Sequence, residues 1–456
     1  MDDGVPNGVN TLLSYSKKVA EMIEEYDGFF LVLSHTDADG VSSALQIYKL
    51  LSEMDKEFHI KFLKNFDSKK FLEIIEESFD VLLILDLGSG YEDFIEAQLR
   101  MRRKRGIIID HHRTEAVGTY EHLSILNPWN FGISGDFEAC TSSLAFSVLL
   151  SYNESFVSLA PFAFAGILGD KQLQNPVGLN KYLLDLAISR GGLKTRRGII
   201  LKRASVAESL AYSLPPYISN VTGDVDGAKA FLKSINLDPE LLTEEVLMNE
   251  EIAKKLSSAI ALKLSEQCID EEDIKGVLGP HYYTEVENYT IYVDDLTEIL
   301  DAMGRSGNTG LLPRLAEYDL RTIFQLTNFA ESIKKDAIKA LRDLESSYKD
   351  MGTYWFYMCN DPRIRSLVAT FGVSYVVPKD KPLIVMTLEE GSYVISARAH
   401  KSLAEKGLDL SWSLKNVAEK FGGHGGGHRV AAGARIPGEH DLEEILRALK
   451  EALKIV

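Results

Sequence analysis

Ile107-Ile108-Ile109-Asp110-His111-His112 is the stretch of sequence that decides the fold. Three β-branched residues that run straight into an acid and two imidazoles predict a buried strand with metal-type side chains at its carboxyl end. Residues 29–33 and 81–85 are apolar runs of the same form, and a fourth run ends in Gly169-Asp170. In an open parallel sheet, ligands collect at the carboxyl ends of the strands. We therefore expect the side chains that follow these runs to share one crevice: His35, Asp37, Asp39, Asp86, Asp110, His111, His112 and Asp170.

Each of these residues has an ordinary structural alternative. A single aspartate after a buried strand is more often a helix cap or a turn residue than a ligand, and a histidine pair can be a solvated turn. Four such clusters in order, with no lysine or arginine among the ligand positions, favour a site. So many carboxylates would repel one another unless cations neutralised them.

The types of ligand indicate which cations. Carboxylates and imidazoles with no nearby thiolate favour divalent manganese or magnesium over structural zinc. Five or six side chains suit two ions better than one, and an ion pair activates water and stabilises both oxygens of a phosphoryl displacement. The sequence therefore predicts hydrolysis of a phosphodiester or a phosphoanhydride.

These motifs resemble those of a known family. His35-Thr36-Asp37-Ala38-Asp39-Gly40, Asp86-Leu87-Gly88, Asp110-His111-His112 and Gly169-Asp170 are similar to the four motifs of the DHH phosphoesterases. The glycine-rich stretch 422–433 resembles the signature of DHHA1, the associated substrate-binding domain. Among DHH proteins, the resemblance is closest to archaeal RecJ-like exonucleases, including the GINS-associated nuclease.

The resemblance implies two bound divalent ions, with Mn²⁺ preferred and Mg²⁺ possible. His35, Asp37 and Asp86 would hold one ion, while Asp39, Asp86, His111 and Asp170 would hold the other, so that Asp86 bridges. His112 would contact the scissile phosphate as a donor, and Asp110 would orient the imidazoles.

The resemblance also implies a substrate-binding element near the carboxyl end. Gly425, Gly426 and Gly427 would let a phosphate approach the backbone amides, with charge from His428 and Arg429. Taken alone, the glycines fit a plain flexible loop better than a phosphate site. Ser396 and Arg398 lie on a neighbouring predicted strand, where the family often holds substrate with an arginine. A clamp on the terminal nucleotide would make cleavage exonucleolytic.

Composition limits the location and partners of the protein. With 456 residues we expect two or three domains. The net charge of −17 argues against indiscriminate binding of polyanions. Three scattered cysteines and no signal-peptide or membrane-spanning pattern lead us to expect a soluble cytoplasmic protein with no membrane partner.

The order of strands and helices predicts the domains. Strand and helix alternate through residues 1–204, which predicts a doubly wound α/β domain with a parallel sheet. Residues 205–350 read as a mainly helical insert, and residues 351–456 as a smaller α/β unit. Arg190, Lys194, Arg196, Arg197, Lys202 and Arg203 form either a track for a phosphate backbone or a surface linker. The Gly304-Arg305 pair resembles an element of the archaeal relatives and is a candidate for substrate or core contact.

Three functions fit these features. The first is an exonuclease on single-stranded DNA or RNA, which the basic stretch and the insert favour. The second is a phosphodiesterase for short oligonucleotides, nucleoside bisphosphates or cyclic dinucleotides, which the acidic charge favours. The third is a replication scaffold with an inactive site, against which the intact acids and imidazoles count. Under the first and third, the insert is expected to meet GINS or other components of a replicative helicase.

Overall fold

The computed structural model describes residues 7–114 and 120–453. They form two compact units, one made of Met1–Arg197 and Pro280–Ala330 and the other of Gly198–Gly279 and Glu331–Val456. This division differs from the expected boundaries after residues 204 and 350. Residues 280–330, expected in the insert, belong to the first unit because they pack on its helices.

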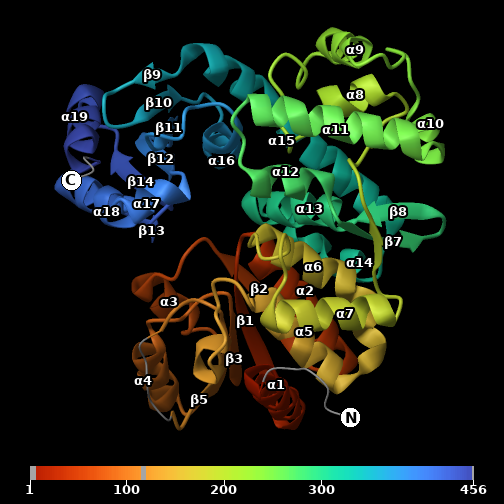
Figure 1. Cartoon of the computed structure of the whole chain (residues 1–456). Helices are drawn as coiled ribbons and strands as arrows, with labels where there is room; N and C mark the ends of the chain where they lie inside the picture. Colours follow the sequence, from red (N-terminus) through yellow and green to blue (C-terminus); the bar gives the residue numbers. More distant parts are fainter. Residues whose placement is uncertain (1–6, 115–119, 454–456) are drawn as a thin grey trace. The chain divides into compact units, whose positions relative to one another are not determined.

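The first unit is built on a five-stranded parallel sheet in the order β2-β1-β3-β4-β5 (Figure 1). The strands are β1 (Phe29–His35), β2 (Glu57–Leu63), β3 (Val81–Leu85), β4 (Arg105–Ile109) and β5 (Leu123–Leu126). The chain leaves β1 for β2 on one side and then returns to β3 on the other. This reversal creates a crevice at the carboxyl ends of β1 and β3, where ligands of such sheets bind. The predicted doubly wound fold is confirmed.

Helices cover both faces of this sheet, which is why its central strands are continuous apolar runs. Val81, Leu83 and Leu85 of β3 face one core and Leu82 and Ile84 face the other. The first core is closed by α1 (Asn7–Glu25), α2 (Ala38–Glu53), α5 (Thr141–Tyr152), α6 (Ala160–Gly169) and α7 (Gly178–Ser189), and the second by α3 (Ser68–Ile74) and α4 (Glu92–Arg102).

Buried polar side chains fix α5 against α2. The hydroxyls of Ser42 and Ser142 lie 2.7 Å apart, and Gln46 Nε2 donates to Ser142 Oγ over 2.9 Å. A Cβ on Gly166 of α6 would lie 2.5 Å from Ser142 Cβ, so only glycine lets the third helix approach. This contact sets the start of α5 beside the first turn of α2.

Residues 280–330 add a small sheet and two helices to the first unit. β6 (Lys194–Arg196), β7 (His281–Val286) and β8 (Tyr289–Tyr292) form an antiparallel sheet. α13 (Val293–Ser306) packs on α6 and α2, and α14 (Leu312–Ala316) packs on α2. This region is therefore less purely helical than its charged sequence predicts.

The second unit contains a six-stranded sheet in the order β13-β14-β12-β11-β10-β9. Its strands are β9 (Lys349–Asp350), β10 (Trp355–Met358), β11 (Leu383–Glu389), β12 (Ser392–Arg398), β13 (His424–His428) and β14 (Ala431–Pro437). α16 (Arg365–Tyr375) packs on β11 and β12, while α18 (Leu410–Lys420) packs on β13 and β14, and α19 (Leu442–Ala452) packs on α18. The glycine-rich stretch is thus an edge strand and not a loop.

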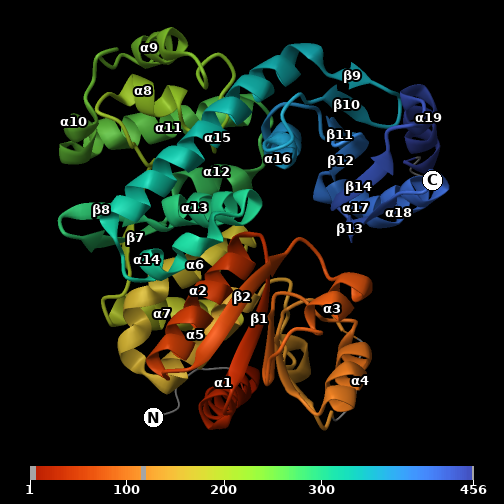
Figure 2. The same cartoon turned by 180° about the vertical axis from the view of Figure 1, so that it is seen from behind.

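The rest of the second unit is helical, as predicted for this part of the insert. It consists of α8 (Val206–Ala211), α9 (Val225–Ser234), α10 (Thr243–Met248), α11 (Glu250–Glu266) and α12 (Glu271–Leu278). The long helix α15 (Leu320–Ser347), seen well in Figure 2, starts in the first unit and ends in the second. Across residues 7–114 and 120–453, no helix has both the length and the apolar character needed to cross a bilayer.

Candidate metal centre

His35 ends β1 with a nitrogen turned toward two acids. Its Nε2 lies 3.1 Å from the Lys64 carbonyl, which can only accept, so in the neutral ring Nε2 carries the proton. The lone pair of Nδ1 then faces Asp37 Oδ2 at 3.0 Å and Asp86 Oδ2 at 3.3 Å. Within the described residues this buried Nδ1 has no hydrogen-bond partner. Such an orphaned nitrogen between two carboxylates fits a bound cation.

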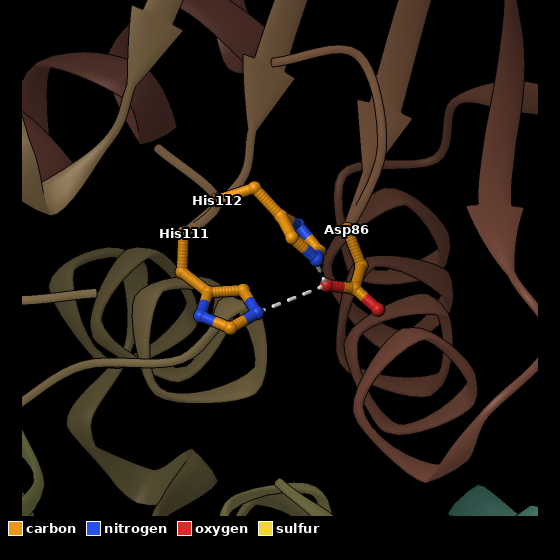
Figure 3. Close-up of side chains that lie close together, drawn as sticks. All are labelled: Asp86, His111 and His112. Carbon is orange, nitrogen blue, oxygen red and sulfur yellow. Dashed lines mark ion pairs between the residues drawn. The ribbon is translucent and has the colours of Figure 1, made fainter. Parts of the chain in front are cut away.

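Asp86, directly after β3, presents one oxygen to each side of the crevice. Its backbone has a φ of +59°, a left-handed conformation that aspartate tolerates better than most residues. Oδ1 lies 3.5 Å from His111 Nε2 (Figure 3). The same oxygen accepts from the Thr141 hydroxyl at 3.1 Å, while Oδ2 faces His35. With 1% of its surface exposed, this carboxylate is placed to bridge two cations.

His111 is oriented in the same way as His35. Its Nδ1 lies 2.7 Å from the Gly135 carbonyl and therefore donates, leaving the Nε2 lone pair toward Asp86 and, at 3.9 Å, Asp39 Oδ2. Asp170, the residue that caps the end of α6, places Oδ2 3.6 Å from His111 Nδ1. The ring thus lies among three acids.

Asp39 lies in the first turn of α2 and faces the amino terminus of α5. Its two oxygens accept from the backbone N–H groups of Thr141 at 2.9 Å and Ser142 at 2.7 Å. The start of a helix favours negative charge there. The packing of α2 on α5 is what brings these amides to Asp39.

Asp110 is fully buried and holds His112. Its carboxylate accepts from Ser89 N at 2.9 Å, from His112 N at 3.2 Å and from His112 Nδ1 at 2.7 Å. The His112 side chain is 39% exposed. Asp110 therefore acts on the ring of His112 and leaves that ring open to a substrate.

The acids of the crevice carry more negative charge than the protein compensates. Burial, reinforced by Asp37 and Asp39, raises the pKa of Asp86 well above its usual range, and burial also raises the pKa of Asp39. Burial raises the pKa of Asp170 to about 7, against the lowering effect of His111. A divalent cation would relieve the repulsion between carboxylates that lie so close together, and so favour their ionised forms.

The same surroundings favour the charged form of two imidazoles, because the acids around them raise their pKa values. Burial disfavours protonation of His111, but Asp170, Asp86 and Asp39 outweigh it and raise its pKa to about 9. Burial likewise opposes protonation of His112, and the hydrogen bond to Asp110 raises its pKa to about 10. Without a cation, both rings are protonated at neutral pH.

Cys140 corrects the sequence expectation that no thiolate is near. Its buried Sγ lies with the carboxylates of Asp39 and Asp170, and the three ligand atoms are within 4.8 Å of one another. Burial and the two acids raise the pKa of the thiol. Sequence spacing does not reveal this contact because Cys140 is far along the chain from every motif.

The structure brings all eight predicted metal-type residues into one crevice. Seven of them fall in three groups that could each hold an ion: His35 with Asp37 and Asp86, Asp86 with His111 and His112, and Asp39 with Asp170 and Cys140. The sequence missed the groups that position them: Thr141 and Ser142, the Gly135 carbonyl, Gln172 and Asn127. Gln172 Nε2 donates to Gly135 O and to Asp170 Oδ2, both at 2.8 Å, and Asn127 Nδ2 donates to His112 O at 2.9 Å. Asn127-Pro128 ends β5, so the strand-end rule could have found it.

Ser396 and Arg398 lie on β12 in the second unit and contact α16. Arg398 donates from Nε to Thr370 Oγ1 at 3.1 Å and from Nη2 to Ser366 Oγ at 3.2 Å. Ser396 Oγ accepts from Arg365 Nε at 3.1 Å. Arg365, which the sequence did not single out, therefore belongs to this group.

The glycines of β13 have different roles. A Cβ on Gly425 would lie 2.8 Å from Leu414 O, and one on Gly427, with a φ of +140°, would lie 2.6 Å from Ala431 O. These two glycines are required by packing. Gly426 has no described atom within 4 Å of such a Cβ, so it borders open space. His428 ends this strand, and the adjacent Arg429 donates to Ala404 O at 3.1 Å.

Gly304 and Arg305 of α13 belong to the first unit. A Cβ on Gly304 would lie 1.9 Å from Thr36 O, so glycine lets α13 touch the loop after β1. Arg305 Nε donates to Asp301 at 2.6 Å, and its charge also acts on Asp37. The pair therefore serves core contact and places a guanidinium near the crevice.

Three of the six basic residues in the stretch 190–203 pair with acids. Arg190 pairs with Glu154, Lys194 with Glu285 at 2.6 Å and Arg203 with Glu331 at 3.1 Å. These pairs weaken the case for a track along a phosphate backbone.

Comparison with known proteins gives matches at both ends of the chain. Residues 30–168 match the model for the DHH family, N-terminal domain, and residues 377–455 match that for the DHHA1 domain. An uncharacterised protein of Methanocaldococcus jannaschii is 28% identical, with 96% of each chain covered.

Two solved structures share the fold. CDC45 from Entamoeba histolytica has a TM-score of 0.69 at 12% identity, covering 99% of this chain and 100% of its own. RecJ in complex with Mn²⁺ from Thermus thermophilus has a TM-score of 0.50 at 16% identity, covering 99% of this chain and 55% of its own.

Proposed function

We propose that this chain, which joins a DHH N-terminal domain to a DHHA1 domain and so belongs to the DHH superfamily, is a metal-dependent exonuclease of the RecJ-like kind. It hydrolyses single-stranded DNA or RNA and releases nucleoside monophosphates. The observation that carries this proposal is the arrangement around Asp86. His35 and His111 each point a ring nitrogen at a different oxygen of that carboxylate.

The residues present fit two divalent ions. His35, Asp37 and Asp86 would hold one, and Asp39, Asp86, His111 and Asp170 the other, with Asp86 shared. Nitrogen and oxygen ligands suit Mn²⁺, and Mg²⁺ to a lesser degree. Bound ions would activate water and stabilise charge on the attacking and leaving oxygens.

His112 is the group assigned to the scissile phosphate. The hydrogen bond to Asp110 raises the pKa of His112 to about 10 in the site without a cation, and the protonated ring would donate a hydrogen bond to a phosphate oxygen. Asp110 holds Nδ1 at 2.7 Å and thereby aims the opposite edge of the ring outward. Asp110 is a positioning residue and does not touch the substrate.

The DHHA1 residues are assigned to the terminal nucleotide. Arg398 and Ser396 supply donors, and Gly426 leaves room beside β13 for a phosphate to approach the backbone. Gly425 and Gly427 keep that strand in place, while His428 and Arg429 add positive charge at its end. Holding the chain end is what makes cleavage exonucleolytic.

The test is degradation of a single-stranded oligonucleotide labelled separately at each end, with Mn²⁺ added. Mononucleotides released from one end by the wild type, and by neither Asp110→Ala nor His111→Ala, would support the proposal. DNA and RNA oligomers run side by side identify the preferred substrate.

A second candidate is a phosphodiesterase of di- and trinucleotides or cyclic dinucleotides. The net charge of −17 and the acid partners of Arg190, Lys194 and Arg203 favour it. Intact long oligomers alongside rapid consumption of dinucleotides would establish this candidate in place of the first.

A scaffold role is the third candidate, since the fold shared with CDC45 covers the whole chain. Two consecutive helices of the insert expose Leu247, Met248 and Leu262, and Met248 is 85% exposed. We assign GINS or another helicase component to this apolar surface. Pull-down that is lost in Met248→Asp and Leu262→Asp would support it, and equal capture by both variants would contradict it.

A further inference from the structure

We propose that Cys140 is a metal ligand and that it makes one of the two cation positions selective for thiophilic ions such as Zn²⁺, Co²⁺ and Cd²⁺. The inference rests on the metal centre of the proposed function and extends it to control of the site by metal identity.

The geometry is close to that of ligands on one cation. Sγ of Cys140 and one oxygen each of Asp39 and Asp170 lie within 4.8 Å of one another. With a metal–sulfur bond of about 2.3 Å and metal–oxygen bonds of about 2.1 Å, two ligands of one ion are at most about 4.4 Å apart. The three atoms are therefore close enough for small side-chain adjustments to bring them onto one ion.

The thiol is held in this position. Cys140 is fully buried and immediately precedes α5, whose first two amides hold the Asp39 carboxylate. Its own N–H donates to Ser143 Oγ at 3.0 Å. These backbone hydrogen bonds hold the main chain of Cys140 where its side chain reaches the carboxylates of Asp39 and Asp170.

The two cation positions consequently differ in hardness. The His35, Asp37 and Asp86 position offers nitrogen and oxygen, which suit Mn²⁺ and Mg²⁺. The position beside Asp39 and Asp170 adds sulfur, which Zn²⁺ and Cd²⁺ bind more tightly than the harder ions do. On binding, the thiol loses its proton to solvent and the thiolate donates an electron pair to the cation. A thiophilic ion would therefore displace Mn²⁺ from one position and leave it at the other.

The experiment is titration of the full chain, freed of metal, with Cd²⁺ and separately with Co²⁺, recording the sulfur-to-metal charge-transfer absorption. The chain has three cysteines, so the matched controls are Cys268→Ser and Cys359→Ser. We expect the band in the wild type, in both controls and in the double variant that retains Cys140 alone. Cys140→Ser and Cys140→Ala should lack it.

Calorimetry separates a lost ligand from a lost fold. Cys140→Ser should bind Cd²⁺ at least about tenfold more weakly, the scale of losing a metal-site contact, while its Mn²⁺ affinity stays within about twofold. If both Cys140 variants fail to fold, the double variant with Cys140 alone still decides.

Stoichiometric Cd²⁺ binding by that double variant without the band would overturn the inference, as would a band that persists in Cys140→Ser. The oligonucleotide assay is independent of this result. Cleavage without the band refutes the thiol ligand alone, and the band without cleavage refutes the proposed nuclease alone.

Discussion

At the scale of single residues, three imidazoles in the crevice donate to different acceptors. The acceptor decides whether the other ring nitrogen is free to bind a cation or carries a proton. The carbonyls of Lys64 and Gly135 accept from His35 and His111, leaving a lone pair on each ring for a cation. Asp110 accepts from His112 and keeps that ring protonated. The same residue type thus provides two ligands and one donor.

Metal binding should release protons. His111, with a pKa of about 9, and Asp170, with a pKa of about 7, must both lose their protons before a cation can bind. The raised pKa values of His35 and Asp86 add to this release, so we expect Mn²⁺ affinity to rise at least about tenfold per pH unit between pH 7 and 9, and more steeply below pH 7. Calorimetry in buffers of different ionisation enthalpy counts these protons. Affinity independent of pH would contradict the assignment of both ligands.

Asp110→Asn should reduce hydrolysis about 10- to 100-fold, the scale for a positioning partner, with little change in Mn²⁺ affinity. Stability provides a second readout. His112 has a raised pKa in the folded chain, so its pairing stabilises fully below about pH 6.5 and is lost as pH rises toward 10. The difference in melting temperature between wild type and Asp110→Asn, measured in chelator, should therefore shrink from pH 6.5 to 10. A constant difference would count against the pair.

At the scale of elements, the loop from Ser134 to Thr141 lines the crevice. The Gly135 carbonyl near one end accepts from His111, and Thr141 at the other end bonds Asp39 and Asp86. Between them Phe137 is 68% exposed. If the substrate is a single strand, an exposed ring two residues from Gly135 would stack on one of its nucleobases.

Phe137→Ala should raise KM for oligonucleotides about tenfold, with kcat and folding unchanged, because one stacked base is lost. Met101→Ala, which removes another exposed apolar side chain from the same unit, is the control. An oligomer abasic at the stacked position should lose the difference between wild type and Phe137→Ala. Equal KM values for the two on normal oligomers would rule out the stacking role.

The glycine-rich strand β13 allows a second test at this scale. Gly425→Ala places its Cβ 2.8 Å from a carbonyl and should lower stability by about 1–3 kcal/mol, as overpacking does. Gly426→Ala meets no described atom within 4 Å and should fold normally. If a phosphate approaches here, Gly426→Ala will still weaken substrate binding. Melting curves and KM values for both variants check this. An unchanged KM in Gly426→Ala would show that no substrate phosphate binds at this strand.

For the molecule as a whole, charge should keep nucleic-acid binding local. The chain carries a net charge of −17, and acids pair with Arg190, Lys194 and Arg203. We expect only a few phosphate contacts, and hence a log–log salt slope of about −2 to −3 for single strands. Binding of His111→Ala to an oligonucleotide across salt concentrations measures it. A slope steeper than about −5 would indicate many phosphate contacts. If replacing Arg190, Lys194 and Arg203 by alanine made that slope shallower, the basic stretch would bind the phosphate backbone after all.

The sequence by itself determined the parallel sheet and the eight acids and imidazoles that meet at its edge. Buried parallel strands need continuous apolar runs, and ligands follow directly at their ends, so both signals are local in the chain. The same locality predicted β1, β3 and β4 together with His35, Asp86 and His111.

Only the tertiary structure decided which other groups join the site. Cys140, the Thr141 and Ser142 amides and the Gly135 carbonyl reach the ligands because α5 is fixed on α2 through buried side chains. Residues 280–330 joined the first unit because α13 packs on α6 and α2, with Gly304 against Thr36. Contacts of this kind depend on the shapes of surfaces formed by residues far apart in sequence, which no local pattern encodes.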